Sequence, residues 1–168
     1  MQKLKLLLLP LTALSIFLIA EGCQSVEDFP DEPQITFKSF ETEGPNSAVL
    51  KINFTDGDGD IGLSEADTLP PFCPEECDYY YNLLCEYYEK QDGEWVIFVD
   101  LAAPFYYRVP IVEPSGQNPT LEGEIHIDLN AYYITGTGYD TCRMSVKLID
   151  RSLNESNEVF TRTYTKPN

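Results

Sequence analysis

The sequence predicts a single all-β domain, an antiparallel β-sandwich, and three observations support this fold class. From residue 34 onward, apolar and polar side chains alternate with a period of two in one segment after another. Clusters of Gly, Pro, Asn and Asp separate these segments, as turns between strands require. No segment keeps a helical period. About eight strands in about 130 residues are typical of a sandwich whose sheets each have one face in water.

Residues 1–22 are predicted to be a secretory signal peptide that is removed before Cys23. After a basic start comes an apolar run, residues 6–20, which is too short to cross a bilayer. Residues 20–23 resemble a bacterial lipobox, although Glu21 stands where a small residue is usual. This resemblance implies that the thiol of Cys23 is acylated, palmitate being the expected chain, and that Cys23 becomes the mature N-terminus. The alternative is a plain signal peptide followed by an incidental cysteine.

Residues 23–33 are predicted to form the lipid-bearing cysteine and a short tether, because they are acidic and contain proline but show no apolar period. Acidic residues directly after the lipidated cysteine resemble the export signal that carries Bacteroidota lipoproteins to the cell surface. We therefore expect a cell-envelope protein that is lipid-anchored in the outer membrane and exposed at the cell surface. The remaining residues, 34–168, are expected to form the sandwich.

Each strand of the sandwich is predicted from its own alternation. In the first strand Ile35 and Phe37 are expected to face the core, and in a long later strand Tyr79 is expected to share the inner face with Tyr87. The polar stretch 150–157 is predicted to be the loop between the last two strands. The predicted strands cover residues 34–38, 48–55, 79–87, 95–101, 106–112, 124–129, 142–148 and 158–165.

The charge of the chain restricts its partners. It carries 11 basic and 28 acidic residues, a formal net charge of −17. Removal of the signal peptide takes away Lys3, Lys5 and Glu21, which leaves nine basic and 27 acidic residues in the mature chain. Such a surface repels phosphate backbones, which argues against nucleic acid as a partner. It also repels anionic lipid headgroups, so we expect the acyl chains on Cys23 to provide the membrane anchor.

Four cysteines follow Cys23 in the chain, namely Cys73, Cys77, Cys85 and Cys142. An even number of cysteines in an exported chain indicates disulfide bonds, and three pairings are open. A zinc site made of four thiolates is the alternative. Zinc is disfavoured because no second close pair follows Cys73 and Cys77, and because the expected compartment is oxidising.

The strongest chemical signal is the loop Asp-Gly-Asp-Gly-Asp-Ile-Gly at residues 56–62. Carboxylates at alternate positions, with glycines between them, are able to turn inward on one small volume, which suits the six to eight oxygen ligands of calcium. An EF-hand is not expected, because Ile61 stands where that loop needs glycine and a strand precedes the motif. The alternative is an acidic turn whose aspartates bond backbone amides. The predicted calcium ligands are Asp56, Asp58, Asp60, Glu65 and Asp67.

Two motifs together resemble a group of uncharacterised Bacteroidota envelope lipoproteins. One is the Asp-Gly-Asp-Gly-Asp-Ile-Gly loop after an early strand, and the other is the Asp-Arg…Asn-x-Ser-Asn turn at residues 150–157. The resemblance spans most of the mature chain. It implies an immunoglobulin-like sandwich on the cell envelope, and it implies no activity. The four later cysteines are not part of this pattern.

The sequence contains no familiar catalytic motif. His126 is the only histidine, and the alternation around it places it on the solvent face, as expected for a surface residue. Outward-facing tyrosines such as Tyr80 and Tyr88 would offer a stacking platform for a glycan or for an envelope protein partner. We therefore expect a non-catalytic binding or structural module rather than an enzyme. One alternative is a glycan-binding accessory protein of a surface uptake system. The other, which we favour least, is a glycan-active enzyme.

Overall fold

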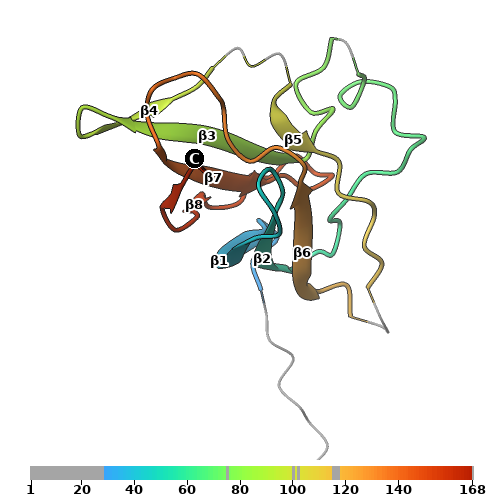
Figure 1. Cartoon of the computed structure of the whole chain (residues 1–168). Helices are drawn as coiled ribbons and strands as arrows, with labels where there is room; N and C mark the ends of the chain where they lie inside the picture. Colours follow the sequence, from blue (N-terminus) through green and yellow to red (C-terminus); the bar gives the residue numbers. More distant parts are fainter. Residues whose placement is uncertain (1–28, 75, 100, 102, 115–117, 168) are drawn as a thin grey trace, which may run out of the picture.

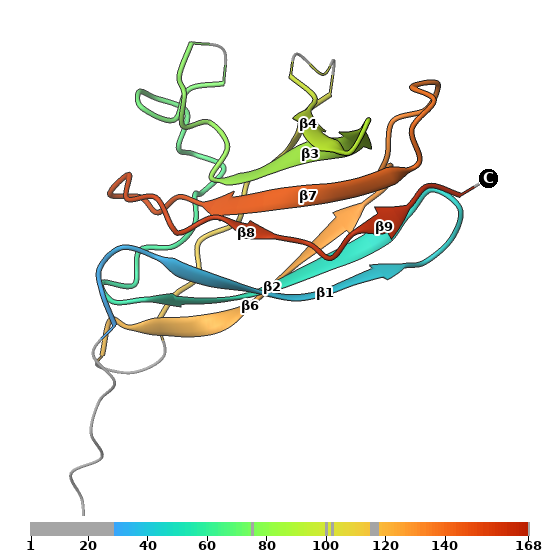
Figure 2. The ribbon, with the colours of Figure 1, turned by 90° about the vertical axis from the view of Figure 1, so that its left-hand side faces the viewer.

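The computed structural model describes residues 29–74, 76–99, 101, 103–114 and 118–167, and the predicted signal peptide and Cys23 lie outside them. Two antiparallel sheets pack against each other with the apolar core between them, so the predicted all-β sandwich is confirmed (Figure 1). Figure 2 shows the two layers edge-on. The described residues contain no helix, and therefore none long and apolar enough to cross a membrane.

The first sheet has the strand order β1-β2-β6 and consists of β1 (Gln34–Thr42), β2 (Ala48–Asp56) and β6 (Leu121–Leu129). β2 lies in the centre and pairs with β6 over nine residues, from Ala48 opposite Leu129 to Asp56 opposite Leu121. The alternating apolar residues of β2 and β6 point inward, as their period of two predicts. The outward residues of β6 are mostly charged, and the predicted exposure of His126 is confirmed.

A register shift in β1 changes which residues reach the core. The pairing with β2 slips between Phe37 and Ser39, so that Phe40 becomes fully buried while Phe37 is only partly buried. The ring of Phe40 stacks on that of Tyr164, with 4.5 Å between the centroids. A bulge of this kind inserts one residue into the alternation, which a strict period of two does not anticipate.

The second sheet has the order β4-β3-β7-β8, with two short strands beside this path. Alternate side chains of β3 and β7 are buried against the first sheet, and Tyr87 of β3 is among the largest of them. β5 pairs with β3, and β9 pairs with β7. The strands are β3 (Leu83–Gln91), β4 (Glu94–Ile97), β5 (Phe105–Tyr107), β7 (Thr141–Leu148), β8 (Val159–Phe160) and β9 (Tyr164–Thr165).

The order of the strands follows the immunoglobulin pattern. In that fold strands A, B and E share one sheet, and strands C, F and G share the other. Here β1, β2 and β6 take the places of A, B and E, whereas β3, β7 and β8 take those of C, F and G. β2 and β7 therefore correspond to the two central strands that face each other across the core.

The Tyr-rich segment before β3 does not belong to the strand, which corrects the prediction. The strand begins only at Leu83, and the buried side chain of Asn82, directly before it, bonds the backbone of Val109. Asn82 Oδ1 accepts from the Val109 amide at 2.6 Å, and its Nδ2 donates to the Val109 carbonyl at 3.2 Å. Tyr79 and Tyr81 consequently lie in the turn that precedes β3.

Three further predicted strands are shorter than expected. β4 ends at residue 97 instead of 101, and β5 ends at residue 107 instead of 112, close to Pro110, which donates no backbone hydrogen bond. The last predicted strand is split into β8 and β9. Between them, Thr161 Oγ1 accepts the amide of Met144 at 3.0 Å, so a side chain replaces the backbone partner of β7.

One disulfide joins Cys73 to Cys77 in the loop before β3, whereas Cys85 and Cys142 are free and buried. Cys85 lies opposite Val146, and Cys142 lies opposite a residue four positions further along β3. An offset of four residues separates their Cα atoms by about 13 Å, too far for a disulfide. Burial also raises the pKa of the Cys85 thiol to about 12, which disfavours its reactive thiolate form.

Candidate metal centre

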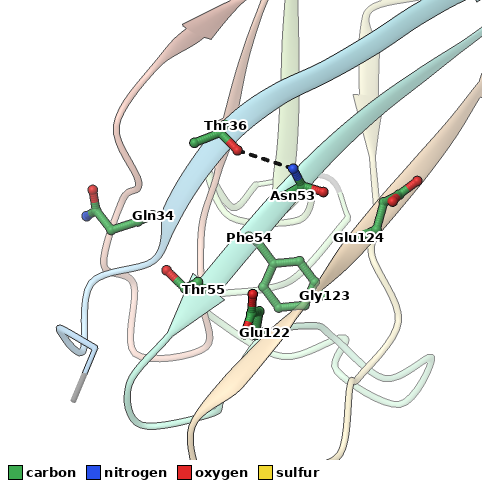
Figure 3. A pocket seen from close by; sticks show the side chains of 8 residues that line it. All are labelled: Gln34, Thr36, Asn53, Phe54, Thr55, Glu122, Gly123 and Glu124. Atoms are coloured by element: carbon green, nitrogen blue, oxygen red, sulfur yellow. Dashed lines mark hydrogen bonds between the residues drawn. The ribbon is translucent and has the colours of Figure 1, made fainter. Parts of the chain in front are cut away.

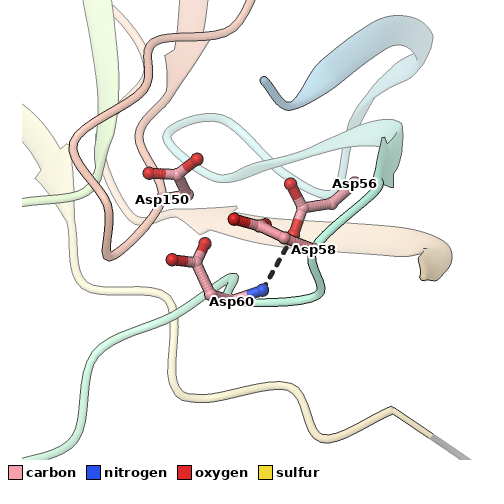
Figure 4. A group of neighbouring side chains, drawn as sticks. All are labelled: Asp56, Asp58, Asp60 and Asp150. Atoms are coloured by element: carbon pink, nitrogen blue, oxygen red, sulfur yellow. Dashed lines mark hydrogen bonds between the residues drawn. The ribbon is translucent and has the colours of Figure 1, made fainter. Parts of the chain in front are cut away.

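Four aspartates from distant parts of the chain converge at one end of the sandwich. Asp56 is the last residue of β2, Asp58 and Asp60 follow it, and Asp150 comes shortly after β7. One carboxylate oxygen from each of them lies within 4.8 Å of the others. Figure 4 shows Asp150 facing the other three from the opposite loop. Because β2 and β7 belong to different sheets, the cluster joins the two layers.

Glycines shape the loop that carries three of these aspartates. The amide of Gly57 donates to the Pro30 carbonyl at 2.8 Å, and a Cβ on Gly57 would lie 2.7 Å from the same oxygen. Gly59 has a φ of +72°, and a Cβ there would lie 1.8 Å from the carbonyl oxygen of Pro119. Only glycine fits such close backbone approaches. The loop is therefore held in a tight path by neighbouring backbone.

The fourth aspartate is presented by a closed turn. The backbone amide and the side-chain amide of Asn154 each donate to an oxygen of Asp150 at 2.8 Å. Between them Leu153 adopts a φ of 70°, the left-handed conformation that closes the turn. Ser156 Oγ accepts the amide of Leu148 at 2.9 Å and fixes the turn to the end of β7. The hydrogen bonds within the Asp-Arg…Asn-x-Ser-Asn motif thus hold Asp150 in place.

Burial and mutual repulsion disfavour the ionised form of these carboxyl groups. Asp56 and Asp150 are 0% and 1% exposed. Burial, followed by the charges of its three neighbours, raises the pKa of Asp56 to about 7, although the amide of Asp60 donates to its Oδ2 at 2.9 Å and opposes the rise. Burial is also the largest cause of the raised pKa values of Asp58 and Asp150.

Two carboxylate oxygens in the cluster have unsatisfied hydrogen-bonding capacity. Among the described residues, Oδ1 of Asp56 and Oδ1 of Asp60 are buried and accept no hydrogen bond. Figure 4 shows the carboxylate of Asp56 turned toward the other three. At separations of about 4 to 5 Å, two ionised carboxylates repel each other by about 3–4 kcal/mol at an effective dielectric constant of about 20. A divalent cation among the four would neutralise this repulsion and give both oxygens a partner.

The donor set fits calcium. All four ligands are hard carboxylate oxygens, which favour Ca²⁺, Mg²⁺ or Mn²⁺ over zinc or copper. Four carboxylates leave two to four positions of a calcium shell for backbone carbonyls or water. Asp58 is exposed, so water reaches the site from that side. Four carboxylates from two separate loops suit the irregular geometry of calcium better than the strict octahedron of magnesium.

The structure changes the predicted ligand set. It brings Asp56, Asp58 and Asp60 together, but Asp67 lies against Arg151, whose Nη1 and Nη2 donate to its two oxygens at 2.6 and 3.2 Å. This bidentate pair is the main reason why the pKa of Asp67 falls below its ordinary value.

The other predicted ligand, Glu65, is exposed in a turn and is absent from the cluster. Asp150 takes the place of both, and sequence reasoning missed it. The signal that pointed to Asp150 was the late motif, whose first residue it is. Spacing along the chain favoured nearby carboxylates, whereas the fold joins the ends of two strands that are far apart in sequence.

A shallow cleft of about 530 Å³ lies on the outer face of the first sheet (Figure 3). Its carboxylates include Glu124, which binds Lys38 and His126. The hydrogen bond from Lys38, with a further contribution from His126, lowers the pKa of Glu124, so this group is ionised and does not suit the role of a general acid. The lining residues are Gln34, Thr36, Asn53, Phe54, Thr55, Glu122, Gly123 and Glu124.

The two tyrosines predicted to form a stacking platform are each engaged by an arginine. The guanidinium of Arg108 lies 4.7 Å from the ring centre of Tyr80, in the turn before β3. The guanidinium of Arg143 lies 5.4 Å from that of Tyr88 and also stacks on Trp95. Both tyrosines are half-buried. Their role in binding a glycan or a partner protein therefore stays a prediction.

No family model and no curated protein matches this chain. A solved structure with a similar arrangement is that of chitinase ChiW from Paenibacillus sp. strain FPU-7, described as a bacterial cell-surface-expressed multi-modular enzyme machinery. The match has 14% sequence identity and a TM-score of 0.39, and it covers 89% of this chain. The chain spans only 9% of that enzyme.

Proposed function

We propose that this protein is a non-catalytic, calcium-stabilised immunoglobulin-like module of the bacterial cell envelope, anchored in the outer membrane through lipid on Cys23 and exposed at the surface. The observation that carries the calcium part is the buried Asp56, whose Oδ1 has no partner among the described residues although three more carboxylates surround it. The module is proposed to bind or to support another envelope component. A glycan-binding role stays the alternative.

A cation bound by carboxylates from both sheets is proposed to stabilise the folded domain and not to take part in catalysis. Asp56 and Asp150 are buried, so they are available to an ion but not to a large substrate. Asp58 alone of the four is exposed, which leaves a narrow approach for an ion and its water. Calcium sites of extracellular modules typically have dissociation constants of about 0.1–1 mM, and we expect this range here.

Calcium binding is tested by isothermal titration calorimetry on the purified, metal-free protein. We expect binding in the range of about 0.1–1 mM for the wild type. Asp150→Asn should weaken it at least tenfold, because it removes a charged ligand. Glu65→Gln is the matched control and should leave the affinity unchanged, since Glu65 lies in an exposed turn outside the cluster. Absence of calcium binding, or equal effects of the two changes, would contradict the proposed site.

The lipid anchor is tested separately in a bacterial host that processes lipoproteins. Cells that express the full chain are fed radiolabelled palmitate, and the protein is then recovered from the membrane fraction. We expect the label on the wild type, and its loss together with release from the membrane for Cys23→Ala. Cys73→Ala is the control because its thiol belongs to the Cys73–Cys77 disulfide. Membrane retention of unlabelled Cys23→Ala would refute the anchor.

A further inference from the structure

The metal centre lies where three separate parts of the chain meet. The loop after β2 and the turn after β7 supply the carboxylates, and the start of the domain contacts both of them. The Pro30 carbonyl accepts the amide of Gly57, one residue after Asp56. An ion that holds the loop after β2 and the turn after β7 together would therefore also stabilise the contacts that both make with the segment before β1 and with the start of β1.

Asn157 connects the ligand turn to the edge of β1. Its Oδ1 accepts the amide of Ile35 at 2.8 Å, and its Nδ2 donates to the Ile35 carbonyl at 2.9 Å. The side-chain amide thus pairs with one residue of β1 as a neighbouring strand would, and it satisfies two edge groups of the sheet. We call these two hydrogen bonds between Asn157 and Ile35 the clip on β1. Asn157 is the last residue of the motif that begins with Asp150, so the same short turn carries a ligand at one end and the clip at the other.

Within the part of the chain that the structure describes, the two sheets have no covalent link near this point. Antibody-type domains join strands B and F by a disulfide across the core. In the present chain β2 and β7 take those places, but β2 contains no cysteine and Cys142 of β7 is free. The four aspartates lie just beyond the ends of these same two strands.

We propose that a calcium ion bound by Asp56, Asp58, Asp60 and Asp150 acts as the inter-sheet link of this sandwich and as a lock on the start of β1. The ion draws the turn after β7 onto the loop after β2, and that turn brings Asn157 onto Ile35. Without the ion, repulsion among the carboxylates loosens the turn, and the clip on β1 and the Pro30 contact loosen with it. This inference rests on the proposed function, because it requires that the site binds calcium.

Hydrogen–deuterium exchange, read peptide by peptide on the purified protein with and without calcium, tests the lock. We expect calcium to slow exchange at least tenfold in peptides covering residues 31–40 and 150–158. The tip of the β3–β4 hairpin, residues 90–95, belongs to the second sheet, has no part in the cluster and is expected to exchange by local opening, so its rate should be the same in both conditions. Slowing confined to residues 56–60 and 150, with none at 31–40, would overturn the lock but leave the calcium site intact.

A reciprocal measurement uses a residue that does not touch the ion. If calcium stabilises the contact of Asn157 with Ile35, then loss of that contact must weaken calcium binding by linkage. We expect Asn157→Ala to weaken calcium at least threefold in calorimetry. Asn53→Ala is the matched control, because Asn53 also contacts β1, through Thr36 at 3.5 Å, but from β2 on the outer face (Figure 3).

The outcomes separate the two proposals. Failure of the wild type to bind calcium removes the proposed site itself. Calcium binding that is equally strong in the wild type and in Asn157→Ala refutes the lock alone. Equal weakening by Asn157→Ala and Asn53→Ala also refutes it, because any loosening of β1 would then have the same effect. If Asn157→Ala does not fold, the exchange measurement on the wild type still decides the question.

Discussion

Saturating calcium is expected to raise the melting temperature of the purified protein by about 5–10 °C. An ion that binds only the folded state at a hundred times its dissociation constant adds about 2.7 kcal/mol to the free energy of unfolding. For a domain of this size, 1 kcal/mol corresponds to about 2–4 °C. Differential scanning calorimetry in calcium and in chelator measures the shift directly. An unchanged melting temperature at saturating calcium would contradict the proposed stabilising role.

The variant Asp56→Asn separates the effect of the ion from that of the charges. It should abolish the calcium shift, because it neutralises the most buried of the four ligands. In the metal-free state it should melt higher than the metal-free wild type, since it removes one of several crowded charges from a buried position. A metal-free Asp56→Asn that melts below the metal-free wild type would show that these carboxylates are not under strain without the ion.

The pH dependence of the metal-free protein follows from the same group. The pKa of Asp56 is raised in the folded state from its ordinary value of 3.8 to about 7, so the folded protein binds more protons than the unfolded chain between these values. The contribution of Asp56 to stability is therefore fully present below the unfolded pKa and is lost as the pH rises through about 7. The melting temperature of the metal-free wild type should thus decrease between pH 5 and pH 8. In Asp56→Asn this decrease should be smaller.

Replacement of Gly59 by alanine is expected to have the largest effect of any single change in the loop. A Cβ at this position would lie 1.8 Å from the Pro119 carbonyl oxygen, so the backbone of one of the two segments must move. The left-handed φ of +72° adds backbone strain for any residue with a Cβ. Because of both effects, we expect Gly59→Ala to lower the free energy of unfolding, measured by urea denaturation, by about 3–5 kcal/mol. Calcium binding should be lost as well, because the aspartates on either side shift.

Gly136→Ala is the control for this change. Gly136 has a similar left-handed φ of +80°, but a Cβ there would meet nothing within 4 Å. Only the backbone strain then remains, and we expect a loss of about 1 kcal/mol. Equal losses for the two variants would show that the close approach of Gly59 to Pro119 contributes nothing to the stability of the loop.

Local patterns predicted much of the fold because they depend on near neighbours in the chain. The alternation in residues 48–55, 124–129 and 142–148 located β2, β6 and β7 to within a few residues and identified their buried faces. The prediction was less good where a side chain replaces a backbone partner. Thr161 divides the last strand in this way, and its effect has no signature in apolar periodicity.

The sequence by itself determined the sandwich, the acidic loop and three of the four clustered aspartates, because a period of two and glycines between carboxylates are local features. Only the tertiary structure decided that Asp150 completes the cluster, that Asp67 pairs with Arg151, and that Cys85 and Cys142 stay free. These outcomes depend on which strand ends meet and in which register. Contacts between residues some 90 positions apart are set by the packing of the two sheets, which spacing along the chain does not encode.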